Sequence, residues 1–277
     1  MPGRSDSAFW PAEPDATVPG VITVGVDLGA EPKRTAAAML QWRSDGVELL
    51  ELLTVADDEA ILDLALQADK TGIDCPLGWS DDFVEFVNAH HTGLVPSTPV
   101  DANARKPLRY RATDLHLIDE KVGRPLSVPS DLIAVPAMRA AGLLASLARA
   151  GIEVDRAGVT GGVAETYPAA AIRHWKLDEG RYKGSDHLDT LAIMVGRLRK
   201  ALRGRLDLGA HRDTIRKSDD AFDAVMCALV ARATLIYRGT AQIPQGLVQR
   251  ARREGWIAVP TCRLDELIAP VEYQPSR

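Results

Sequence analysis

Val21-Ile-Thr-Val-Gly-Val-Asp-Leu-Gly29 is an apolar run that ends in an acid and a glycine. Its β-branched residues from Val21 to Val26 predict a buried β-strand. Asp27 stands at the inner end of that strand, where desolvation of its carboxylate is costly unless a cation or a donor compensates. The acid either caps the following turn or handles a metal ion or phosphate on the first strand of an α/β fold. The partners that the rest of the chain offers decide between these two interpretations.

The composition is that of an ordinary globular protein. The chain has 277 residues, of which 46% are hydrophobic and 26% charged, which suits one large domain or two small ones. No uninterrupted apolar run approaches membrane-spanning length, and the first residues lack the apolar core of a signal peptide. Cys75, Cys227 and Cys262 are scattered and form no CxxC pair, which favours reduced thiols over a disulfide framework. We therefore expect a cytoplasmic protein with no membrane partner.

The charge gives little information about partners. A formal net charge of -5 provides no global attraction to nucleic acid. Basic runs occur at 105–111, 197–205 and 250–253, but such runs are more often solvated helix faces than binding surfaces. Nucleic acid therefore stays open as a partner without support from charge.

The order of the expected elements indicates one domain, at 21–262, between a flexible leader at 1–20 and a C-terminal tail at 263–277. Strands expected at 21–26, 35–42 and 47–55 are joined by short turns, which predicts an antiparallel meander. A helix expected at 57–70 leads to a short strand within 71–78, and a helical crossover makes that strand parallel to the first. Asp74 would then lie at the same end of the sheet as Asp27.

The second half of the chain is expected to be mostly helical. The segment from about 80 to 135 is the least regular, as functional or mobile segments often are, apart from a short helix at 81–90. Beyond it, helices are expected at 135–150, 169–176, 186–203 and 218–237, with a short strand at 162–168 and an edge strand or hairpin at 254–260.

The last long helix begins with a group of acids. Ser218 fits its N-cap, and Asp219 and Asp220 suit the positive end of the helix dipole. Asp223 lies one turn further in, between apolar neighbours, where an uncompensated carboxylate is costly. Asp220 and Asp223 are three residues apart and can project from one helix face, where two carboxylates repel each other unless a divalent cation lies between them.

With Asp27 and Asp74, these two acids form an all-oxygen set, which suits Mg²⁺ or Mn²⁺ rather than zinc. Two such ions roughly 4 Å apart can activate a water and stabilise the leaving oxygen in phosphodiester hydrolysis. The sequence therefore predicts a metal-dependent hydrolytic site.

Several short motifs follow the leader in order: Gly25-Val-Asp27, Ile73-Asp74-Cys-Pro-Leu-Gly78, Arg111-Ala-Thr-Asp114, Glu165-Thr-Tyr-Pro168, Tyr182-Lys183, Asp220-Ala-Phe-Asp223-Ala and Glu254-Gly-Trp-Ile257. Together with the order of the elements, they resemble the DUF429 family of predicted nucleases with a ribonuclease H-like fold. The resemblance implies an α/β fold with a mixed five-stranded sheet, flanked by helices and carrying family-specific insertions. It also implies Asp27, Asp74, Asp220 and Asp223 as metal ligands, with Glu165 and Arg111 nearby.

Three further residues allow two interpretations each. Glu165 is either an additional ligand or base, or a cap for the helix after Pro168. Arg111 either pairs structurally with Asp114 or clamps a substrate phosphate. Lys183 either reaches a phosphate of the substrate or is a solvated lysine. The six histidines show no ligand spacing, and no nucleophile elbow or P-loop motif is present.

The leading functional hypothesis is a divalent-metal-dependent nuclease that uses Asp27, Asp74, Asp220, Asp223 and Glu165. A second hypothesis is an ATP- or phosphate-binding protein of the sugar kinase, Hsp70 and actin class, because Asp27-Leu-Gly29 resembles the first phosphate loop of that class. Gly161-Gly162 is then the sole, poor candidate for the further glycine-rich motif that this class needs. The third hypothesis is a catalytically inactive binding module with the same ribonuclease H-like fold.

Overall fold

A mixed β-sheet forms the centre of the structure, a computed structural model that describes residues 20–94, 101–129 and 131–268. Within these residues the sheet has six strands in the order β5-β4-β1-β2-β3-β6. The strands are β1 (Val21–Asp27), β2 (Ala36–Trp42), β3 (Val47–Leu53), β4 (Lys70–Asp74), β5 (Val163–Glu165) and β6 (Leu206–Asp207). β1, β2 and β3 form an antiparallel meander, while β4 and β5 continue parallel to β1.

The predicted meander and the parallel fourth strand are confirmed, but the predicted number of five strands is wrong. The sixth strand, β6, pairs in parallel with Val47 and Glu48 of β3. It has only two residues, too few to show the alternation of apolar and polar side chains that identifies a strand in a sequence.

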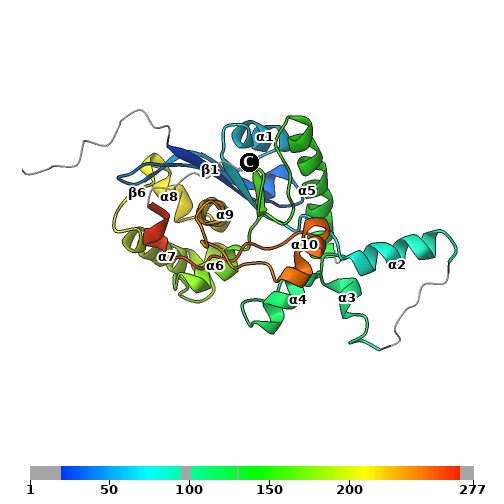
Figure 1. Cartoon of the computed structure of the whole chain (residues 1–277). Coiled ribbons are helices and arrows are strands. Elements are labelled where there is room, and N and C mark those ends of the chain that lie inside the picture. Colours follow the sequence, from blue (N-terminus) through cyan, green and yellow to red (C-terminus); the bar gives the residue numbers. More distant parts are fainter. Residues whose placement is uncertain (1–19, 95–100, 130, 269–277) are drawn as a thin grey trace, which may run out of the picture.

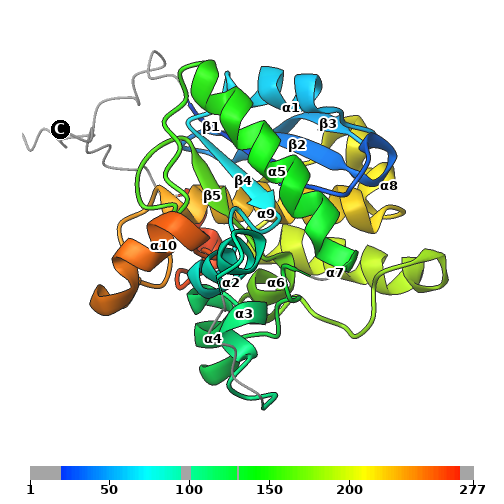
Figure 2. The same cartoon turned by 90° about the vertical axis from the view of Figure 1, so that its right-hand side faces the viewer.

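Helices cover both faces of the sheet. On one face lie α1 (Asp58–Ala65) and α5 (Asp131–Arg149), and the other face packs against α6 (Pro168–His174), α7 (Leu188–Ala201) and α9 (Asp219–Thr234) (Figure 1). The short α8 (Arg212–Ile215) precedes α9. A group beside the sheet consists of α2 (Asp81–His91), α3 (Lys106–Arg109), α4 (Ala112–Asp119) and α10 (Val248–Glu254) (Figure 2).

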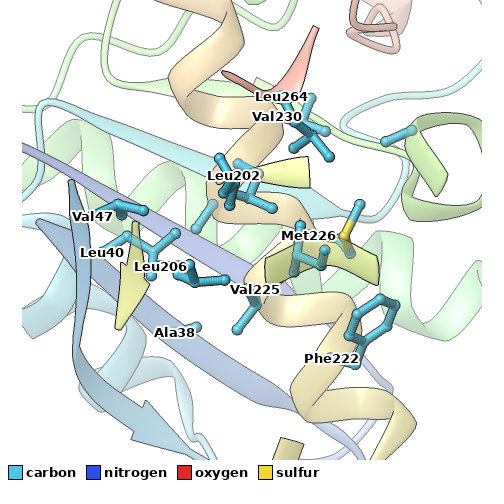
Figure 3. Close-up of a cluster of buried hydrophobic side chains, with 14 of the residues drawn as sticks. Ala38, Leu40, Val47, Leu202, Leu206, Phe222, Val225, Met226, Val230 and Leu264 are labelled. Atoms are coloured by element: carbon cyan, nitrogen blue, oxygen red, sulfur yellow. The ribbon is translucent and has the colours of Figure 1, made fainter. Parts of the chain in front are cut away.

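The core on the α9 side joins the sheet to this helix. Figure 3 shows Leu40 and Val47 of the sheet in one apolar cluster with Val225 and Met226 of α9. The backbone of α9 comes so close to β1 that a Cβ atom at Gly25 would lie 2.0 Å from the carbonyl oxygen of Ala224. Only glycine leaves room for this contact. The sequence of β1 therefore determines how deeply α9 sits on the sheet.

α5 is apolar enough to need a separate comment. Within the described chain it is the one helix whose length and composition would allow it to cross a membrane, with a mean hydropathy of 1.4 over Leu132–Arg149. Arg139 interrupts this stretch, consistent with the absence of a long uninterrupted apolar run. The helix lies across one face of the sheet (Figure 2). Ala140, Leu143 and Leu147 of α5 are buried in the core on that side. In this structure α5 therefore packs one face on the sheet and leaves much of its remaining surface exposed.

Three expectations about local structure need correction or adjustment. The segment 80–135, expected to hold one helix, contains α2, α3, α4 and the start of α5. The edge strand or hairpin expected at 254–260 is reduced to two isolated bridges, Glu165 to Ile257 and Thr240 to Pro260. Residues Leu264–Ile268, placed in the expected tail, form a 3-10 helix whose Leu264, Leu267 and Ile268 are buried. The leader at 1–19 and residues 269–277 lie outside the described residues.

Candidate metal centre

Three aspartates from three elements converge at one end of the sheet. Asp27 ends β1, Asp74 ends β4, and Asp223 lies in the second turn of α9. Asp27 and Asp74 are direct register partners in adjacent parallel strands. One carboxylate oxygen from each of the three residues lies within 4.8 Å of the other two. We call Asp27, Asp74 and Asp223 the aspartate triad.

Asp220 lies near the triad without joining it. Its side chain is part-buried and lines the same cleft as Asp27 and Asp74. Burial and the charge of Asp219 raise the pKa of Asp220, while Arg34 and Lys183 oppose that rise. Asp219 accepts a hydrogen bond from the backbone N–H of Gly184. Of the four aspartates expected to bind metal, three are therefore within reach of one ion and the fourth lies at the rim.

The triad holds its carboxylates in an unfavourable environment. Asp27 and Asp74 are part-exposed to the cleft, whereas Asp223 is fully buried. Desolvation by the surrounding protein, followed by the charges of Asp223 and Asp74, raises the pKa of Asp27 to about 9. Desolvation and the charge of Asp223 raise the pKa of Asp74 to about 7. A cation among these oxygens would favour their charged forms and reverse both shifts.

Tyr182 and Lys183 both contact Asp223. The Tyr182 hydroxyl donates a 2.8 Å hydrogen bond to Asp223 Oδ1, and Lys183 Nζ lies 2.6 Å from Asp223 Oδ2. Desolvation disfavours the charged form of Lys183, but Asp223, Asp27 and Asp74 together raise its pKa above the ordinary value. Despite this ion pair, Oδ2 makes no hydrogen bond of regular geometry. Asp223 is thus fixed on one side by Tyr182 and presents its second oxygen to a cation.

Glu165 and Arg111 belong to a separate buried network. Arg111 donates to both carboxylate oxygens of Glu165, at 2.6 and 2.7 Å, and to Asp114 Oδ1 at 2.9 Å. Glu165 Oε2 also accepts a hydrogen bond from the backbone N–H of Leu77. Glu254 joins the network by accepting from the N–H of Ala112, while its carbonyl accepts from Arg111. We call Arg111, Asp114, Glu165 and Glu254 the arginine network.

The arginine network fastens α4 and the segment after α10 to the end of β5. Arg111 and Asp114 form the structural ion pair that their spacing predicts, and both side chains are buried. Glu165 has its two oxygens occupied by Arg111 and Leu77, so the structure does not bring it into the aspartate triad. Sequence reasoning missed Glu254, although the short motif Glu254-Gly-Trp-Ile257 marks its position.

The triad opens into a cleft of about 1000 Å³. Asp27 and Asp74 lie in its lining together with Lys183 and Asp220. An all-oxygen triad in an open cleft of this size can hold a hard divalent cation and still admit a substrate. This is the chemistry that the arrangement can support.

A family model described as "Protein of unknown function (DUF429)" matches residues 25–247, which include all three aspartates of the triad. No curated protein and no solved structure matches the chain. Because the matched segment covers most of the 277 residues, the chain belongs to the DUF429 family.

Proposed function

We propose that this protein is a divalent-metal-dependent phosphodiester hydrolase of the nuclease type with a ribonuclease H-like fold. The observation that carries the proposal is the aspartate triad, whose oxygens lie within 4.8 Å of one another although they come from β1, β4 and α9. Three neighbouring acids with one ammonium, that of Lys183, against them destabilise the folded state, because their mutual repulsion and desolvation oppose folding. A bound cation would offset this repulsion and desolvation, and would explain why the fold brings the three acids together.

The sheet supports the fold part of the proposal. Its strands β5-β4-β1-β2-β3 combine an antiparallel three-strand meander with parallel strands reached through helices. This is the arrangement implied by the resemblance to the ribonuclease H-like fold, to which β6 is an addition at the edge. The acids also occupy the places that the resemblance implies: the ends of the first and fourth strands and the start of a late helix.

The donor set favours Mg²⁺ or Mn²⁺. Carboxylate oxygens are the ligands that these hard cations prefer, and Asp223 Oδ2 is a buried oxygen whose ion-pair partner, Lys183, a divalent cation could replace. Asp27, Asp74 and Asp223 would hold the ion, and Tyr182 would keep Asp223 oriented toward it. Such an ion supplies polarisation of a phosphate oxygen and a bound water of lowered pKa. Lys183 and Asp220 would then face the substrate from the cleft lining.

The geometry weighs against the kinase-like alternative. Gly161 and Gly162 precede β5, and Lys70 Nζ bonds to the carbonyl of Gly161 at the start of β4. The triad lies at the other ends of these parallel strands. A phosphate loop at Gly161–Gly162 would therefore be separated from Asp27 by the length of β4. An inactive binding module stays as the second alternative, and it differs from an enzyme in having no use for metal.

The test is a calorimetric Mn²⁺ titration followed by a hydrolysis assay. We expect saturable Mn²⁺ binding by the wild type, weakened at least about tenfold by Asp27→Asn because one of three ligands loses its charge. Asp213→Asn is the matched control, since Asp213 lies on α8 with a side chain that is 78% exposed. Mn²⁺-dependent cleavage of phosphodiesters should disappear in Asp27→Asn and persist in Asp213→Asn. Unchanged hydrolysis in Asp27→Asn, or no Mn²⁺ binding by the wild type, would overturn the proposal.

A further inference from the structure

The cleft beside the aspartate triad has a wall that the metal chemistry does not use. The loop before α5 contributes Pro125 and Leu126, and the first turns of α5 contribute Leu132, Ile133 and Pro136 to the cleft lining. We call these five residues the apolar wall. Leu126 is 51% exposed and Leu132 is 77% exposed, so among the described residues these large apolar side chains of the cleft lining stay largely uncovered.

Exposure of such leucines to water is unfavourable, and a ligand that covers them lowers the free energy of the system. The wall shares one cleft with five acidic residues, among them Asp27 and Asp74 of the triad, and with the cations Arg34, Arg124 and Lys183. A ligand that fills this cleft therefore needs an anionic part for the metal and the cations, and an apolar part for the wall.

We propose that the apolar wall is a subsite for one unpaired nucleobase, whose phosphate lies at the aspartate triad. This inference rests on the proposed function and names its substrate class. A nucleoside phosphate combines the two required parts within one small unit, because a base offers a planar apolar face next to its anionic phosphate. Tyr167 adds an aromatic ring to the same lining.

The size and charge of the cleft favour a single nucleotide unit over a double helix. A volume of about 1000 Å³ suits one ligand of a few hundred daltons. Binding to a duplex usually depends on about 6–10 phosphate contacts, whereas the described cleft lining offers Arg34, Arg124 and Lys183 beyond the neutralised Arg111. The net charge of -5 adds no general attraction to a polyanion. The base must therefore arrive unpaired, either in a free nucleotide or in a single strand.

The first experiment measures binding rather than turnover. Calorimetry compares deoxyadenosine 5′-monophosphate with 2-deoxyribose 5-phosphate, which has the same phosphate but no base, and with octyl phosphate, which has an alkyl chain. We expect the nucleotide to bind about tenfold more tightly than the sugar phosphate, since covering a base face contributes about that much. Equal affinities, or tighter binding of octyl phosphate, would overturn the inference.

Substitution of the wall then locates the base. Leu126→Ser combined with Leu132→Ser should abolish the preference for the nucleotide and leave the affinity for 2-deoxyribose 5-phosphate unchanged. Both side chains are more than half exposed, so the fold should tolerate the change. Val84→Ser combined with Val87→Ser is the matched control, because these valines of α2 are 54% and 44% exposed and do not line the cleft. A preference that survives in the wall variant would assign the base to another place.

Two further experiments test whether the base must be unpaired, and distinguish failure of this inference from failure of the proposed function. A single-stranded oligonucleotide should bind more tightly than the blunt duplex of the same sequence, and only its binding should weaken in the wall variant. A duplex that binds equally well would contradict the unpaired base. In Mn²⁺, a wild type that binds the metal but shows no preference for the nucleotide over 2-deoxyribose 5-phosphate refutes this inference alone. Failure to bind Mn²⁺ refutes the proposed function.

Discussion

Asp27 and Asp74 face each other as register partners at the carboxyl ends of the adjacent parallel strands β1 and β4. Neighbouring strands lie only about 4.8 Å apart, so two carboxylates in this position repel each other through poorly hydrated space. α9 adds the buried Asp223 to the pair. The protein therefore keeps three acids in contact at the point where its fold brings three elements together.

The first prediction concerns pH in the absence of metal. Asp27 has a pKa of about 9 and Asp74 of about 7, against an ordinary value of 3.8. Between pH 4 and those values, the folded state holds protons that the unfolded state has released. The free energy of unfolding should therefore fall as pH rises, by up to about 1.4 kcal/mol per pH unit and group. Thermal unfolding in EDTA between about pH 5 and pH 8 measures this slope.

Mn²⁺ should flatten the same slope, because a bound cation favours the deprotonated carboxylates. Asp27→Asn should also flatten this slope in EDTA, since the variant lacks the carboxyl group whose pKa is raised to about 9. An identical pH dependence in wild type and Asp27→Asn would show that the folded protein does not protonate this site.

Lys183 is the subject of the second prediction. Its ammonium lies 2.6 Å from Asp223 Oδ2, and its side chain as a whole is 55% exposed. Because it competes with a divalent cation for the same oxygen, Lys183→Met should raise the affinity for Mn²⁺. The increase should be about threefold to tenfold, a modest range because water screens an exposed ammonium. Calorimetric titration measures the change, with the exposed Lys200→Met on α7 as the control.

The same variant should bind substrate phosphate less well, since it lacks a cation in the cleft. Weaker Mn²⁺ binding in Lys183→Met would contradict the competition and would indicate that the lysine orients Asp223 for the metal.

The order of strands could be predicted because each strand of the meander is long enough to show its apolar pattern, and because a helical crossover requires a parallel partner. Asp27 and Asp74 could be placed at one end of the sheet on the same grounds. The strand β6 could not be predicted, because Leu206–Asp207 is too short to show a pattern of apolar and polar residues. Its pairing with β3 becomes visible in the folded structure.

Some residues of the candidate site could likewise be predicted from the sequence, and others could not. Asp223 stood out in the sequence because an acid among apolar residues of a buried helix needs compensation. The sequence could not predict the role of Glu165, because its partner Arg111 is 54 residues away and only the tertiary structure brings their side chains together. The apolar wall was equally hidden, since exposure of Leu126 and Leu132 depends on what the fold leaves uncovered.

The third prediction separates a structural role of the arginine network from a catalytic one. Arg111→Met leaves Glu165 and Asp114 buried without their cation, which should lower the free energy of unfolding by about 3–5 kcal/mol. Arg43→Met is the control, because Arg43 pairs with Glu48 at the surface with a side chain that is 55% exposed and should cost less than about 1 kcal/mol. Urea denaturation measures both. An Arg111→Met protein of wild-type stability with impaired phosphodiester hydrolysis would instead identify Arg111 as a phosphate clamp.

The last prediction tests whether the contact between β1 and α9 sets the geometry of the triad. Gly25→Ala would place a methyl group 2.0 Å from the Ala224 oxygen and 2.2 Å from the Ala228 nitrogen, so α9 must move away from β1. Overpacking of this kind should lower the free energy of unfolding by about 3 kcal/mol. Because Asp223 moves with α9 while Asp27 stays on β1, the affinity for Mn²⁺ should fall by at least about tenfold.

Gly196→Ala on α7 is the matched control, since no atom lies within 4 Å of its added methyl group. That change should raise the free energy of unfolding by about 0.5–1 kcal/mol, as alanine does in an open helix position, and leave Mn²⁺ binding unchanged. Urea denaturation and calorimetry on the two variants give both quantities. If Gly25→Ala lost stability but bound Mn²⁺ as the wild type does, the triad would tolerate a displaced α9. Its ligands would then be held together by the ion itself, and the close approach at Gly25 would serve the core alone.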